Sequence, residues 1–180
     1  MILAPDNEDV LHDALARAVA DAESLLDRTE KGRGGHLRLF YSHTPAIGHA
    51  GMVELWVSPW VGGTSNVKSK GKYLVYAFEK AIRLAQCHPR LGHVSSEQSA
   101  DPRNELWNGA SMVLVKIPEL ATGSIWVMPS ASGWPAKADA AIGLRMLQRI
   151  PQWKLDMGSV EQVLQVSNNH FAKKLLALPL

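Results

Sequence analysis

Residues 53–86 constrain the fold most strongly, because a strand pattern, a loop pattern and a helix pattern follow one another there. Residues 52–58 are mostly apolar and predict a strand that is buried on both faces apart from Glu54. The glycine- and lysine-bearing segment VGGTSNVKSKGK comes next and predicts a loop. Residues 73–86 then place Leu74, Ala77, Phe78, Ala81, Ile82 and Ala85 at helical spacing, which predicts that these side chains face inward. Free backbone amides at the start of such a helix favour an anion, so the segment predicts a phosphate-binding loop.

The remainder of the chain alternates helical and strand patterns. Helices are expected at 6–28 and 136–150, and a last helix from a capping box of Ser159 and Gln162 to about residue 176. Strands are expected at 36–42 and, as a hairpin, at 111–117 and 124–128. Residues 93–99 predict a weak strand, residues 101–108 one or two helical turns capped by Asp101, and SASGWP a turn.

This order predicts a single α/β domain over residues 1–180. We expect a single mixed sheet flanked by helices, with a long N-terminal helix and two C-terminal helices. The apolar fraction of 46% excludes a disordered chain.

Composition narrows the location and the partners. A single cysteine, Cys87, excludes an internal disulfide framework and fits a reducing compartment. No apolar run reaches the length of a membrane span, and the first residues lack the pattern of a secretion signal, so we expect a cytoplasmic protein without a membrane partner. A net charge of +2 is too small to predict nucleic-acid binding by itself. Basic residues at 28–33 and 68–72, together with six tryptophans, leave a local contact with single-stranded nucleic acid open.

The lysine-bearing loop matches neither of two common phosphate-binding motifs. A Walker A loop requires glycine where this chain has Asn66 and serine or threonine where it has Tyr73. The spacing G-x-G-x-x-G of a dinucleotide-binding turn is absent from the loop.

The same segment resembles motif A of the GCN5-related N-acetyltransferases. Val57, Ser58 and Pro59 look like the strand end of that motif, and residues 68–73 stand where its pyrophosphate loop is found. The chain departs from the motif at Lys68, which replaces arginine or glutamine, and at Tyr73, which replaces glycine or alanine. Trp107 stands near the position of the family's tyrosine acid.

The resemblance implies that acetyl-CoA is the cofactor and that an acyl group passes to a small-molecule or protein amine. Glu54 would then be the catalytic base, because burial among apolar neighbours raises a carboxyl pKa towards the useful range. The cofactor-binding residues would be Val57, Val67, Lys68, Ser69, Lys70, Gly71, Lys72 and Tyr73. The alternative is a solvated lysine loop beside a glutamate that faces water.

Two other features of the sequence bear on a metal site and on a haem-binding fold. His43, His49, Cys87, His88 and His93 form no tight ligand pair, so we expect no metal site. Residues 123–144 are similar in composition to the last part of GlcG/HbpS-like haem-binding domains, whose fold is also a sheet flanked by helices.

Two functional hypotheses follow. The first is an acyl-CoA-dependent N-acyltransferase-like protein. The second is a non-enzymatic binding or assembly subunit that contacts nucleic acid or partner proteins. The oligomeric state stays open in both.

Overall fold

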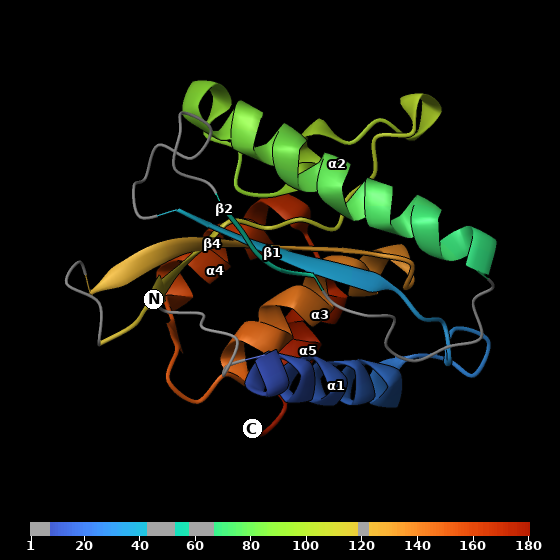
Figure 1. Cartoon of the computed structure of the whole chain (residues 1–180), viewed down its shortest axis with the longest axis horizontal. Helices are drawn as coiled ribbons and strands as arrows, with labels where there is room; N and C mark the ends of the chain where they lie inside the picture. The colour runs from blue at the N-terminus through green and yellow to red at the C-terminus, as the bar shows by residue number, and fades with distance from the viewer. Residues whose placement is uncertain (1–7, 43–52, 58–66, 119–122) are drawn as a thin grey trace.

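The computed structural model describes residues 8–42, 53–57, 67–118 and 123–180. Over these residues it confirms the expected fold class: a single sheet flanked by helices, with a long helix at the N-terminus and helices at the C-terminus. Figure 1 shows the sheet between two unequal layers of helices.

The sheet contains five described strands in the order β2-β1-β4-β3-β5. Their bounds are β1 His36–Ser42, β2 Val53–Val57, β3 Val113–Lys116, β4 Ser124–Ser132 and β5 Lys154–Leu155. All the pairings between these strands are antiparallel. The expected sheet is therefore present, and its described part contains no parallel pair. In the described part of the chain, β2 has β1 as its neighbour and lies at the edge of the sheet.

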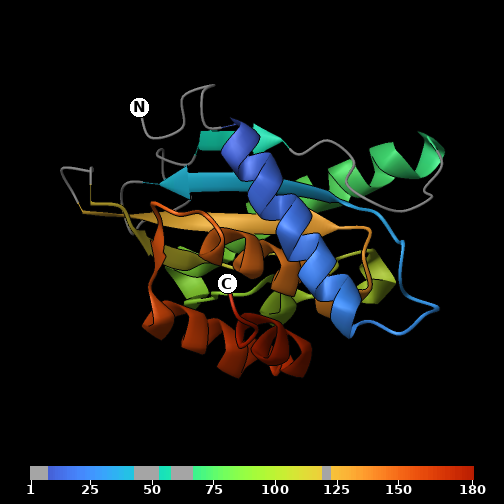
Figure 2. The ribbon, with the colours of Figure 1, turned by 90° about the horizontal axis from the view of Figure 1, so that it is seen from below.

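The helices divide unequally between the faces of the sheet. Helices α1 (Glu8–Leu25), α3 (Ala136–Gln148) and α5 (His170–Leu176) pack together on one face, where Figure 2 shows α1 crossing the strands. Helix α4 (Met157–Ser167) packs against β3. Helix α2 (Val67–Leu91) lies on the opposite face, with the short 3₁₀ helices η2 (Ser96–Ser99) and η3 (Pro102–Asn104) beside it.

Each face has its own apolar core. The larger core lies among α1, α3, α5 and the sheet, and includes Leu15, Leu37, Val115 and Ile142. The smaller one joins α2 to the sheet through Phe40, Ala81, Leu84, Ala85, Ala110, Met112 and Met128. Because α2 contributes mostly alanines, it lies close to the strands and buries little side-chain area of its own.

Several boundaries agree with the sequence and several differ. The strand at 36–42, the hairpin of β3 with β4 and the Asp101 cap of η3 are confirmed. The predicted strand at 93–99 is wrong, because residues 96–99 form η2 under a capping box of Ser95 and Gln98. The predicted turn SASGWP is wrong in its first half, since β4 continues to Ser132 while paired with β1.

The last helix also differs from expectation. Asp156, and not Ser159, caps α4, because its side chain accepts a hydrogen bond from the Ser159 amide. Ser159 instead accepts a hydrogen bond from the Leu114 amide and donates one to the Asp156 carbonyl. Asn168, with a φ of 45°, then divides the predicted helix into α4 and α5.

Candidate interaction surface on helix α2

The predicted site residues lie on two neighbouring elements. Glu54 and Val57 belong to β2, where their Cα partners on β1 are Phe40 and Arg38. Residues 67–73 do not form the expected loop, since they make up the first two turns of α2. Lysine is a good helix former, and Gly71 alone costs too little to stop the helix there. The helix ends at Leu91, followed by Gly92 in the left-handed region.

The inward face of α2 is turned relative to the prediction. Ala77, Ala81 and Ala85 are buried as expected, but Lys80 and Leu84 are buried with them. Phe78 was expected to face inward, yet its side chain is 42% exposed, and Ile82 is half-buried. The prediction followed the larger apolar residues, whereas the space above the sheet accommodates alanines and the stem of a lysine.

This rotation leaves apolar side chains on the outer face of α2. We call Val75, Phe78 and Ile82 the α2 ridge; they stand at positions i, i+3 and i+7 of the helix. Val75 is 64% exposed. The Phe78 ring is held on one side by the Phe40 ring, edge to face at 5.8 Å between centroids, and by the Arg38 guanidinium 5.7 Å from its centroid. The ridge is therefore fixed at its centre by contacts with β1, exposed at Val75 and Phe78, and half-buried at Ile82.

Aromatic residues also lie on the other flank of α2. The Trp107 ring, 37% exposed, is tilted against the Tyr76 ring with centroids 6.2 Å apart. The ammonium group of Lys72 lies over the Tyr76 ring at 5.2 Å. The neighbouring Tyr76 side chain raises the pKa of Lys72, as does the Glu105 carboxylate to a smaller extent, so this exposed lysine stays charged at neutral pH.

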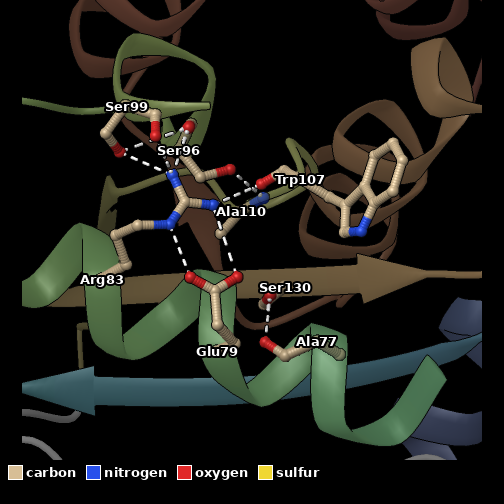
Figure 3. Close-up of polar contacts among 8 residues, drawn as sticks. All are labelled: Ala77, Glu79, Arg83, Ser96, Ser99, Trp107, Ala110 and Ser130. Carbon is tan, nitrogen blue, oxygen red and sulfur yellow. Dashed lines mark hydrogen bonds and ion pairs between the residues drawn. The ribbon is translucent and has the colours of Figure 1, made fainter. Parts of the chain in front are cut away.

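Arg83 connects the segment that carries Trp107 to helix α2, and Figure 3 shows its contacts. Its Nε donates to Glu79 Oε1 at 2.6 Å, and its terminal nitrogens donate to the carbonyl oxygens of Ser96, Ser99 and Trp107. Ser96 Oγ in turn accepts a hydrogen bond from the Ala110 amide. We call these residues the Arg83 cluster. Through these contacts Arg83 fixes residues 96–110 against α2 and pairs with Glu79.

A second polar cluster is enclosed between α2 and the start of α3. Lys80 Nζ lies 3.2 Å from Asp139 Oδ2, with side chains only 1% and 7% exposed, and donates to the Ala131 carbonyl at 2.7 Å. Asp139 Oδ1 accepts from the Trp134 amide. Burial raises the pKa of Asp139 to about 7, against the opposing effects of the Lys80 charge and the Trp134 hydrogen bond. A substrate cannot reach either group without opening the fold, so we assign the pair to structure.

Gly109 shows how tightly this pair is enclosed. Its φ is +127°, and a β-carbon there would lie 2.6 Å from the Ala131 oxygen and 2.8 Å from Lys80 Nζ. No side chain larger than hydrogen fits, so the chain passes the ion pair at a glycine.

The sequence-predicted histidines and cysteine do not converge. His88 Nδ1 is 2.8 Å from the His93 carbonyl, and Cys87 is half-buried. Among the described residues no three His, Cys, Asp or Glu side chains are grouped to hold a metal ion. His43 and His49 lie outside the described residues. No helix in the described ranges is long and apolar enough to cross a bilayer.

Comparison with known proteins identifies no relative, since no family model, no curated protein and no solved structure matches the chain. The resemblances to N-acetyltransferases and to haem-binding domains therefore stay predictions. Sequence reasoning missed the α2 ridge and the Lys80–Asp139 pair. The available signal was the spacing of Ala77, Ala81 and Ala85, which marks the closest contact of the helix with the sheet and places Lys80 beside it.

Proposed function

We propose that this protein is a non-enzymatic binding or assembly subunit, and that a partner protein docks on the α2 ridge. The observation that carries the proposal is the alignment of Val75, Phe78 and Ile82 along one side of α2, where Val75 and Phe78 are exposed and Ile82 is half-buried. Isolated exposed apolar side chains are ordinary, but a row at helical spacing is the pattern by which one protein engages another.

The packing of α2 supports this proposal. The helix is attached to its own sheet by Ala77, Ala81, Leu84 and Ala85 and by the buried Lys80. The ridge adds little to that attachment beyond the Phe78–Phe40 contact. Its exposed apolar area gains free energy only when another surface covers it.

A site-specific photo-crosslinker tests the proposal. We would place it at residue 75 in living cells, identify the crosslinked protein, and purify that protein for binding measurements. Phe78→Ser should weaken its binding by at least about tenfold, as expected of a central aromatic anchor. Val166→Ser is the matched control, because Val166 on α4 has the same 42% exposure as Phe78. Equal binding of wild-type protein and Phe78→Ser would overturn the proposal.

Acyl-CoA-dependent transfer is the second candidate, and the start of α2 favours it. The helix begins at Val67, has no acid in its first turn, and carries Lys68, Lys70 and Lys72 within its first two turns. A helix start of this kind attracts a pyrophosphate.

Thermal shift with acetyl-CoA and with coenzyme A tests this candidate. Stabilisation that disappears in the Lys68→Ala/Lys70→Ala/Lys72→Ala variant is expected if the cofactor binds there. Glu54→Gln should then keep the thermal shift and abolish transfer to an amine. No shift at millimolar ligand would exclude the candidate.

A further inference from the structure

We infer that the segment docking on the α2 ridge is an acidic amphipathic helix of a different protein. The inference rests on the proposed function and adds the chemistry of the partner to it.

The shape of the ridge favours a helix. Its three side chains lie on one nearly straight row, about 10 Å long at 1.5 Å per residue. A row at i, i+3 and i+7 is complementary to the same row on a second helix, because side chains of one then fill the spaces between those of the other. Phe78 stands at the centre, where Phe40 and Arg38 already limit its movement. A partly immobilised aromatic ring loses little entropy on binding and suits the role of an anchor.

The charge around the ridge favours an acidic partner. By sequence, α2 carries Lys68, Lys70, Lys72, Lys80, Arg83 and Arg90 against one acid, Glu79. Lys80 is neutralised by Asp139, and Glu79 is engaged by Arg83, so neither changes the sign of the outer surface. Lys72 is exposed, with the Glu105 carboxylate as the acid that acts on it. The lysines of α2 outnumber the acids beside the apolar row, so glutamates flanking a partner's apolar stripe would complement the helix.

The same charges disfavour a second copy of this chain. Two α2 helices packed antiparallel would bring Lys68, Lys70 and Lys72 of one copy towards Arg90 of the other. Packed parallel, they would bring the three lysines of both copies together. Either arrangement sets like charges against each other at the border of the contact.

Two synthetic peptides test the inference. Both carry leucines at i, i+3 and i+7 and have equal length, but the flanking positions are glutamate in one and lysine in the other. Fluorescence anisotropy with the full chain should show the acidic peptide binding at least about tenfold tighter, a difference of about 1.4 kcal/mol, with affinity falling as salt is added. Phe78→Ser should abolish the binding of both peptides, and Lys72→Glu should lower the affinity for the acidic peptide. Val166→Ser should leave the affinity for each peptide unchanged.

The outcomes separate the inference from the proposed function. Equal affinity for both peptides would overturn the inference that the partner is acidic. If Phe78→Ser then abolished the binding of both peptides, the ridge would still be supported as a docking site. Failure of both peptides would overturn the helical partner, and the crosslinking experiment would still decide whether a protein docks at the ridge. Self-association in light scattering that Phe78→Ser abolishes would overturn the inference in favour of a second copy.

Discussion

At the scale of single residues, the ion pair of Lys80 with Asp139 lies where no ligand can reach it. Lys80 and Asp139 come from helices on opposite faces of the sheet and meet beside the Ala131 carbonyl at the end of β4. Ion pairs removed from water stabilise a fold only when each group is fully hydrogen-bonded, and removal of one partner leaves the other unsatisfied. The pair therefore serves to fix α2 relative to α3.

Lys80→Met should destabilise the fold by about 3–5 kcal/mol near neutral pH, because it leaves Asp139 buried without its cation. Loss of the lysine also removes an effect that lowers the Asp139 pKa, so the cost should be larger at about pH 8 than at about pH 5. Urea unfolding at the two pH values measures both effects. The exposed pair Arg17–Asp13 on α1 provides the control, since Arg17→Met should cost less than about 1 kcal/mol. Equal costs for the two variants would contradict the assignment of Lys80.

Asp139 gives a pH dependence of defined sign. Its pKa is about 7 in the folded chain, against 3.8 for an aspartate exposed to water, so the folded state binds more protons than the unfolded state between these values. The contribution of this group to the free energy of unfolding is present below about pH 4 and is lost as pH rises through about 7. Asp139→Asn cannot titrate, and its stability relative to wild type should therefore rise across that window. A constant difference between the two proteins from about pH 4 to about pH 8 would show that the carboxyl does not titrate there.

At the scale of elements, the sequence predicted best the segments whose pattern depends on local chemistry. His36–Ser42 alternates in polarity, Asp101 precedes a proline that suits a first helical position, and both features are found as expected. The rotation of α2 was not predictable from its apolar spacing, because the large residues Phe78 and Ile82 suggested a core face that the alanines in fact provide. Residues 95–99 were equally ambiguous, since their structure depends on contacts with Arg83 and Ala110 far along the chain.

The Arg83 cluster makes a prediction for this element. Arg83→Met keeps the side-chain stem but removes the donors to the carbonyls of Ser96, Ser99 and Trp107, and should cost about 2–4 kcal/mol. Hydrogen exchange should quicken first at the Ala110 amide and the neighbouring 96–107 segment, with α3 protected until global unfolding. Arg103→Met, on an exposed turn of the same segment, should leave exchange unchanged. Uniform loss of protection in both segments would mean that Arg83 acts on the whole fold.

At the scale of the whole molecule, the two faces of the sheet differ in kind. One face is covered by α1, α3 and α5 around a large apolar core, and the other by α2 and short 3₁₀ turns over a small one. An antiparallel sheet can leave one face less covered, and here that face holds a helix with an apolar row among its exposed polar residues. The candidate site was thus only half predictable. The chemistry of residues 67–73 is visible in the sequence, whereas the ridge exists only once the helix is placed on the sheet.

Different residues of α2 should determine the stability of the fold and the binding of a partner. Val75→Ser/Ile82→Ser leaves the inward alanines and the Phe78 contacts in place, so it should lower the free energy of unfolding by about 1 kcal/mol, mostly through the half-buried Ile82. Leu84→Ala, one position on the fully buried side of the same helix, should cost about 2–5 kcal/mol. Chemical unfolding gives both values, and the acidic peptide reports binding in the same samples. If the fold needed the ridge, the two variants would lose stability alike. Because α2 is attached to the sheet through its other side, we expect the double variant to stay folded and to lose the peptide.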